Sequence, residues 1–190
     1  MPVLDNFIYH KEKALDHKTC ENIITSFKKS NHTLNDHDYY GIYPDITDIK
    51  YNFLIPILQD CLKEYGERHK FLGTRLNQLC VDKEFHIQKY LVGTCYDQAY
   101  DPNYWLGHCE HGASDYDSRR LLGWMFYLND IKKDGGTCFP QQNFTTKPRA
   151  GDLYIWPAAW THSHHGIEAP KEIKYIMTGW CSWLSRKETD

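Results

Sequence analysis

From about residue 84 onward, the sequence consists of short strand-like stretches separated by turn-forming residues. The clearest strand-like alternation begins at Phe85 and continues to Val92. Further strands are expected at 104–110, 119–129, 137–139, 144–148, 152–156, 162–167 and 174–184. Many short strands at near-even spacing are typical of a sandwich or barrel. We therefore expect a mainly β core between about residues 82 and 186.

Two amphipathic helices are expected before this core. Asp16 stands at an N-cap position, and one apolar stripe follows it: Cys20, Ile23, Ile24 and Phe27. Pro56 suits the first turn of a second helix, where its missing N–H costs no hydrogen bond. A short strand is expected within residues 2–10 and a loop over 30–48. The pattern predicts a single domain over residues 1–190, with its helices mainly within 14–80.

The composition argues against several classes of protein. A net charge of −3 provides no broad basic surface, which argues against nucleic acid as a partner. The seven cysteines are odd in number and contain no C-x-x-C pair, so reduced thiols in the cytoplasm are the simplest interpretation. The N-terminal stretch shows no long apolar signal sequence, and no apolar run reaches the ~20 residues of a membrane span.

One short motif carries possible metal chemistry. In a strand, His108 and Glu110 would point to the same face, because residues two apart share a face. A further imidazole, such as that of His164, would complete a set of two histidines and one carboxylate. Such a set binds Fe(II) and leaves coordination positions open. The tripeptide alone is a weak signal, so its sequence context decides.

That context resembles the prolyl 4-hydroxylase-like type of Fe(II)/2-oxoglutarate-dependent oxygenase. The landmarks occur in the family's order: Ile87–Tyr90, His108 with Glu110, Arg119–Arg120, Phe126–Asn129, Gly135–Pro140, Lys147–Asp152, His164–Gly166, Lys174 and Thr178–Trp180. The resemblance covers roughly the C-terminal half of the chain. It implies a double-stranded β-helix, also called a jelly roll, with the N-terminal helices flanking it.

The resemblance assigns the iron ligands, and therefore the catalytic centre, to His108, Glu110 and His164. Prolyl hydroxylases usually have Asp where this chain has Glu110, which is a departure from the family pattern. His162 would share a strand face with His164, so it is an alternative ligand, a residue that orients a ligand, or a packed side chain.

Further roles follow from the same resemblance. Lys174 corresponds to the cation that pairs with the far carboxylate of 2-oxoglutarate, and hydroxyl partners of that carboxylate are expected at Tyr90, Thr137 and, more weakly, Tyr127. The substrate-holding positions correspond to Arg120 and Trp180. The tyrosine-rich stretch 96–104 is expected to be either a lid over the site or a packed surface loop.

The resemblance thus implies an enzyme that uses Fe(II), 2-oxoglutarate and O2, and the need for ascorbate as an accessory reductant is left open. It would hydroxylate a prolyl residue of a peptide or protein and release succinate and CO2. The alternatives are an oxygenase acting on a small molecule and a cupin-like metal-binding barrel without turnover. A zinc hydrolase is disfavoured because H-E-x-x-H and P-C-x-x-C are absent. The oligomeric state is left open.

Overall fold

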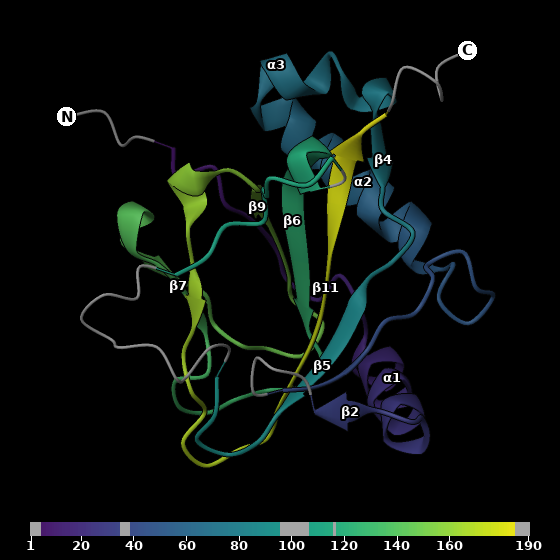
Figure 1. Cartoon of the computed structure of the whole chain (residues 1–190), viewed down its shortest axis with the longest axis vertical. Coiled ribbons are helices and arrows are strands. Elements are labelled where there is room, and N and C mark those ends of the chain that lie inside the picture. Colours follow the sequence, from purple (N-terminus) through teal and green to yellow (C-terminus); the bar gives the residue numbers. More distant parts are fainter. Residues whose placement is uncertain (1–4, 35–38, 96–106, 116, 185–190) are drawn as a thin grey trace.

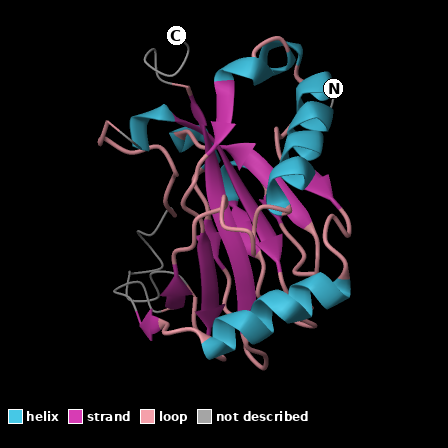
Figure 2. Ribbon diagram, turned by 90° about the vertical axis from the view of Figure 1, so that its right-hand side faces the viewer, coloured by secondary structure: helices cyan, strands magenta, loops and turns pink. Residues whose placement is uncertain are grey.

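The computed structural model describes residues 5–34, 39–95, 107–115 and 117–184. These residues form a large antiparallel sheet and a small sheet, with the helices packed on the side of the large sheet that faces away from the small one (Figures 1 and 2). Within them, the helices are too short or too polar to cross a membrane. The expected mainly β core with N-terminal helices is confirmed.

The helices cover one face of the large sheet. They are α1 (His17–Lys29), α2 (Leu54–Arg68) and α3 (Lys70–Gly73). The Asp16 carboxylate accepts a hydrogen bond from the Thr19 N–H at 2.7 Å, so the predicted N-cap of α1 is present. Short 3-10 turns occur at Leu76–Gln78, Asp117–Arg119, Pro140–Gln142 and Trp160–His162.

The large sheet has eight strands. Seven of them follow the order β1-β9-β6-β11-β5-β3-β2, and β4 pairs with β11 beyond the end of β5. Their bounds are β1 Tyr9–Lys11, β2 Thr33–Leu34, β3 Tyr40–Ile42, β4 Leu79–Val81, β5 His86–Tyr90, β6 Arg120–Tyr127, β9 Leu153–Pro157 and β11 Lys174–Trp183. The strand β11 therefore lies in the middle of the sheet.

The small sheet faces the large one across the interior. It consists of β7 (Thr137–Phe139), β8 (Phe144–Thr145) and β10 (His165–Gly166), in the order β10-β7-β8. Figure 1 shows β7 apart from the large sheet, on the side away from the helices.

Residue alternation gives β11 two different faces. Tyr175 and Met177 pack in the apolar core under the helices, whereas Ile176 packs in the core between the sheets. Side chains two residues apart share a face. Lys174, Thr178 and Trp180 therefore point with Ile176 toward the small sheet, into the interior where the site lies.

The structure corrects three local predictions. Residues 30–48 were expected to be a loop, but they contain β2 and β3, and β3 pairs with β5. No regular strand includes the described part of 104–110; His108 forms only an isolated bridge with His164. The expected strand over 162–167 is interrupted, since His162 ends a 3-10 turn and β10 begins at His165.

These differences have physical reasons. Two-residue strands and single bridges depend on a partner segment brought close by the fold, and no local periodicity specifies them. The stretch 30–48 lacks alternation over a sufficient length, yet its backbone completes the hydrogen bonding of the sheet edge. All seven cysteines lie in described parts of the chain, and none forms a disulfide bond.

Candidate active site

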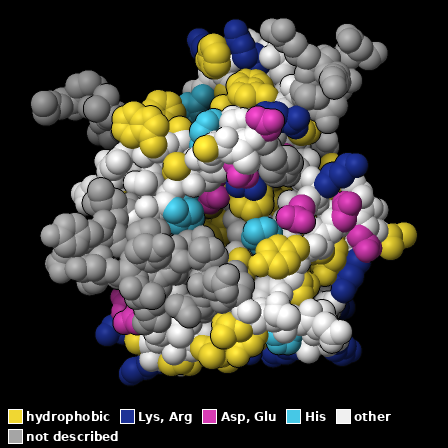
Figure 3. Space-filling view, viewed as in Figure 1, with side chains coloured by type: hydrophobic (Ala, Val, Ile, Leu, Met, Phe, Trp, Pro, Cys, Tyr) yellow, Lys and Arg dark blue, Asp and Glu magenta, His cyan; other side chains and the backbone are white. Residues whose placement is uncertain are grey.

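A cavity of about 590 Å³ opens between the two sheets. Figure 3 shows a hollow near the centre of one face, with histidine and acidic side chains at its edge. The side chains that line the cavity include Tyr39, Tyr43, Glu84, His86, Gln88, Tyr90, His108, Glu110, Arg120, Met125, Thr137, Trp156, His164, Lys174, Ile176, Thr178 and Trp180. Polar groups of both charges thus converge in one partly enclosed space.

One side of the cavity holds the predicted metal ligands. Glu110 Oε1 lies 3.2 Å from His164 Nε2 and 3.8 Å from His108 Nε2. One ligand atom from each of the three residues lies within 4.8 Å of the other two. The three side chains therefore converge, although His108 and Glu110 do not share a regular strand.

The backbone between His108 and His164 fixes this convergence. The two residues exchange N–H···O bonds of 2.9 and 2.8 Å. Gly107 precedes the bridge with a φ of +85°, and a Cβ at this position would lie 2.4 Å from the His164 carbonyl oxygen. Only glycine tolerates both that conformation and that close approach. Gly107 therefore allows the two histidine-bearing segments to meet.

A second contact orients the His164 ring. Its Nδ1 lies 3.0 Å from the carbonyl oxygen of His162. Placing the proton on Nδ1 makes it the donor and leaves Nε2 as a lone-pair donor toward a metal. The His162 side chain is engaged elsewhere, with its Nε2 2.9 Å from the Asn6 carbonyl oxygen. The structure thus places the backbone of His162, and not its imidazole, next to the candidate metal ligands.

The Glu110 side chain is 11% exposed, and its two carboxylate oxygens have different partners. Oε1 faces the imidazoles, whereas Oε2 accepts a hydrogen bond from the Trp180 indole N–H at 2.6 Å. Burial by itself raises the pKa of the Glu110 carboxyl. The neighbouring imidazoles and the indole N–H outweigh burial and lower that pKa to about 2. The carboxylate is therefore ionised across the physiological range.

The donor set fits Fe(II). Two imidazoles and one carboxylate are ligands that suit this ion, and the cluster contains no thiolate that would select a softer metal. The three donor atoms face one another and lie beside an open cavity, so positions remain for further ligands. His108, Glu110 and His164 are thus a chemically suitable site for the predicted iron.

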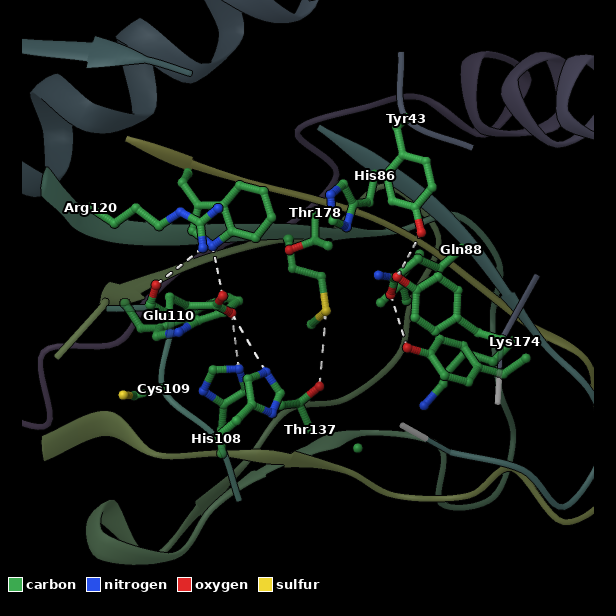
Figure 4. Close-up of a pocket in the computed structure, with 18 of the residues that line it drawn as sticks. Tyr43, His86, Gln88, His108, Cys109, Glu110, Arg120, Thr137, Lys174 and Thr178 are labelled. Atoms are coloured by element: carbon green, nitrogen blue, oxygen red, sulfur yellow. Dashed lines mark hydrogen bonds and ion pairs between the residues drawn. The ribbon is translucent and has the colours of Figure 1, made fainter. Parts of the chain in front are cut away.

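Lys174 lies on the side of the cavity away from Glu110 (Figure 4). Only 3% of Lys174 is exposed. Its Nζ donates to the Ile167 carbonyl at 3.1 Å and lies 4.7 Å from the centre of the Tyr90 ring. Burial lowers the pKa of this ammonium to about 8. A buried ammonium beside a cavity is suited to bind a carboxylate, because an ion pair is stronger where water is excluded.

The hydroxyl groups predicted near Lys174 occupy different places. The Tyr90 hydroxyl donates to Gln88 Oε1 at 2.9 Å, and both residues line the cavity. Thr137 also lines it. Tyr127 does not: its hydroxyl is buried 2.6 Å from Thr146 Oγ1 and 3.2 Å from Thr137 Oγ1. Tyr127 therefore holds the Thr137 side chain in place without facing the cavity itself.

The two predicted substrate residues lie together at the metal side. The Arg120 guanidinium stacks over the Trp180 ring at 3.7 Å, and it pairs with Asp117 at 2.9 Å. It also donates to the Glu110 backbone carbonyl at 3.3 Å. The predicted loop 96–104 lies outside the described residues.

Several cavity residues were not predicted. His86 and Gln88 share the β5 face of Tyr90, and Thr178 shares the β11 face of Lys174, so strand alternation could have identified all three. Tyr39 and Tyr43 come from the segment that was expected to be a loop, and no local pattern pointed to them.

The fold and these side chains define a class of protein, a jelly-roll protein with a two-histidine, one-carboxylate site and a buried lysine across one cavity. Comparison with known families gives the particular assignment. The model of the 2OG-Fe(II) oxygenase superfamily matches residues 85–182, about half of the chain. The protein belongs to this superfamily, as its sequence motifs predict.

Known relatives agree with this assignment. A stretch of 120 residues is 26% identical to a probable prolyl 4-hydroxylase 9 of Arabidopsis thaliana, and it covers 52% of this chain and 40% of that relative. The match therefore spans less than half of the plant protein.

Two solved structures share the fold over most of their length. A viral collagen prolyl hydroxylase from Paramecium bursaria Chlorella virus-1 has a TM-score of 0.65 at 16% identity, with 95% of this chain and 97% of that chain covered. A Pseudomonas putida prolyl-4-hydroxylase has a TM-score of 0.68 at 14% identity, with 94% of each chain covered. Together with the two sheets seen here, they confirm the double-stranded β-helix fold.

Gly107→Ala is expected to weaken divalent metal binding. The added methyl would meet the His164 carbonyl and strain the positive φ, at about 1–2 kcal/mol for the conformation alone. We expect at least a ~10-fold rise in the Mn(II) dissociation constant, measured by calorimetry. Gly93→Ala is the matched control, since Gly93 also has a positive φ (+72°) but has open space around it. Equal effects of the two substitutions would contradict the proposed role of Gly107.

Proposed function

We propose that this protein is an Fe(II)- and 2-oxoglutarate-dependent oxygenase that hydroxylates a prolyl residue of a peptide or protein. One observation carries the proposal: a His-Glu-His cluster with an ionised carboxylate and a buried lysine line the same cavity from different sides (Figure 4). 2-Oxoglutarate carries a carboxylate and keto group at one end and a second carboxylate at the other. Its two ends match the two sides of the cavity.

His108, Glu110 and His164 would hold the iron. When bound, the iron supplies activation of dioxygen coupled to oxidative decarboxylation of 2-oxoglutarate, which yields succinate and CO2. The chain itself contributes ligand placement. The bridge between His108 and His164 fixes their spacing, and the buried Glu110 carboxylate adds a negative charge that favours a cation.

Lys174 would hold the far carboxylate of the co-substrate. Its ammonium sits in a low-dielectric environment, where an ion pair is stronger than it is in water. Thr137 and Tyr90 line the same cavity, and their hydroxyl groups, which bond to Met125 and Gln88 here, can rotate to donate to carboxylate oxygens. Together these groups would set the orientation of the co-substrate before the substrate binds.

Arg120 and Trp180 would hold the substrate near the metal side. The Trp180 ring can pack on a pyrrolidine ring with little loss of side-chain entropy. The Arg120 guanidinium has several fixed donors for the carbonyl groups of an extended chain. Prolyl hydroxylases with the same fold support the proposal of a peptide substrate. One of them, from Trichoplax adhaerens, was solved with a hypoxia inducible factor peptide fragment and has a TM-score of 0.64 at 13% identity.

A binding barrel without turnover is the alternative from another class. Such a barrel needs metal ligands but has no need of a buried ammonium on the other side of the cavity. Burial of Lys174 costs folding free energy, since it lowers the pKa of the lysine. We infer that the buried lysine is kept, despite this cost, because it binds the co-substrate.

We also propose a reducing compartment such as the cytoplasm, with ascorbate as an accessory reductant in assays. The cysteine pattern supports the reducing compartment. Cys20, Cys61 and Cys181 are buried, and burial raises the pKa of each thiol, as is typical of structural cysteines that stay reduced.

Removal of a proposed iron ligand should abolish metal binding. We expect His108→Ala, Glu110→Ala and His164→Ala each to weaken the binding of Fe(II), measured without oxygen, more than ~100-fold. Loss of a residue that only supports a metal ligand costs about 10–100-fold. Calorimetric titration measures this change. His162→Ala is the control, because its imidazole bonds to Asn6 away from the cluster. Loss of binding in His162→Ala, with binding retained in His164→Ala, would transfer the ligand role to His162.

Lys174→Met should separate co-substrate binding from folding. It should raise the dissociation constant for 2-oxoglutarate at least ~30-fold, since loss of a charged partner costs about 2–5 kcal/mol. The same change should stabilise the apo protein by up to roughly 3 kcal/mol at pH 7, because it removes a buried charge. Urea unfolding measures the second effect. The exposed Lys171→Met is the control, and unchanged 2-oxoglutarate binding in Lys174→Met would refute the assignment.

The same lysine predicts a pH dependence. The folded-state pKa of Lys174 is lowered to about 8 from 10.5, so the unfolded chain holds more protons in that interval and stability rises with pH across it. Binding of 2-oxoglutarate requires the charged form. Its dissociation constant should therefore rise roughly tenfold per unit above pH 8, in titrations of the Mn(II)-loaded protein.

Mass spectrometry tests the substrate class. Proline-containing peptides, free proline and a base-modified oligonucleotide are incubated with protein, Fe(II), 2-oxoglutarate and ascorbate. We expect a gain of one oxygen on a prolyl residue of a peptide, and no gain with His164→Ala. Oxidation of only free proline or only the oligonucleotide would leave an oxygenase but reject the peptide substrate.

A further inference from the structure

Trp180 makes a contact that substrate binding alone does not explain. Its indole N–H donates to Glu110 Oε2 at 2.6 Å, and only 7% of Trp180 is exposed. Glu110 Oε1 meanwhile faces His108 and His164 at 3.8 and 3.2 Å. One carboxylate oxygen is thus directed toward the two imidazoles, and the other is held by an indole.

The tryptophan is itself held in place. Arg120 covers its ring at 3.7 Å, and the His86 ring contacts its edge at a centroid distance of 4.9 Å. Trp180 pairs with Gly123 across β11 and β6, where the partner strand carries no side chain. The indole N–H is therefore a donor of fixed position, and its partner is a carboxylate whose side chain is only 11% exposed.

The length of Glu110 makes this contact relevant to the metal. Compared with Asp, Glu has one more methylene, so it has more freedom to rotate and to present both oxygens to one ion. Two-oxygen coordination would occupy a position that the co-substrate or dioxygen needs. An indole bonded to Oε2 opposes that rotation.

We propose that Trp180 is a positioning residue that restricts Glu110 to binding the metal through one oxygen, Oε1, and so keeps coordination positions open for 2-oxoglutarate. The inference rests on the proposed metal site. It also links that site to the substrate, because a peptide that engages Arg120 and Trp180 contacts the group that fixes the carboxylate.

The test uses Co(II), whose visible absorption reports coordination number without turnover. Trp180→Phe keeps an aromatic face for Arg120 but removes the N–H. We expect the visible spectrum of the Co(II) protein to change, because a second carboxylate oxygen would replace another ligand, and the dissociation constant for 2-oxoglutarate to rise at least tenfold.

Trp156→Phe is the matched control. Trp156 lines the same cavity, and its buried indole nitrogen has no hydrogen-bond partner among the described residues. The Trp156 ring contacts the His164 ring at a centroid distance of 5.0 Å, but no hydrogen bond joins it to Glu110. We therefore expect smaller changes in spectrum and in 2-oxoglutarate affinity than in Trp180→Phe. A second comparison uses Glu110→Asp, whose shorter carboxylate cannot make the same contact with the indole. On that background Trp180→Phe should add little, because the two changes remove one interaction.

The outcomes separate the two proposals. If the unmodified protein binds no Co(II), both the metal site and this inference are wrong. If it binds Co(II), and Trp180→Phe matches it in spectrum and in 2-oxoglutarate affinity, only the positioning role is wrong. Equal changes in Trp180→Phe and Trp156→Phe would likewise overturn the role, since they would reflect general loss of packing.

Discussion

The strand β11 is buried on both faces, and the rest of the structure depends on how its side chains divide between them. Tyr175 and Met177 pack under the helices, while Lys174, Thr178 and Trp180 reach the cavity. A shift of one residue in its pairing would exchange the two sets. The helices would then meet a lysine, and the cavity would lose both its buried cation and the indole at the metal side.

Pairing on both sides holds that register. β5 places Tyr90 opposite Lys174, and β6 places Gly123 opposite Trp180. The Tyr90 ring thus lies beside the lysine, and the missing side chain of Gly123 leaves room for the Trp156 ring. Buried charges are costly unless they have partners, and in this cavity the partners come from strands that are also needed to close the sheet.

Sequence reasoning succeeded where a long alternation exists. A strand was expected over residues 174–184, and β11 spans Lys174–Trp183, with Lys174 and Trp180 both at the cavity. It failed where a contact is made by a distant segment. Glu110 was expected in a strand, yet it reaches the histidines from an irregular segment whose N–H bonds to the Ala158 carbonyl. The motif identified the residues, but the reason given for their convergence was wrong.

Tyr39 and the contact between Trp180 and Glu110 also could not be predicted from local sequence patterns. Tyr39 lines the cavity because β3 adds to the sheet edge beside β5, and the polar segment around it carries no periodic signal. The resemblance pointed to Trp180 as a substrate residue, but no spacing rule indicates that its N–H reaches Glu110. Such contacts depend on rotamers and on sheet curvature, which emerge only when the strands pack.

The most direct test of the account is a crystal structure of the protein soaked with Mn(II) and 2-oxoglutarate under anaerobic conditions. The account predicts one metal ion bound by His108, Glu110 and His164, with the far carboxylate of the co-substrate paired to Lys174. A metal bound elsewhere, or a co-substrate whose far carboxylate lies away from Lys174, would contradict it.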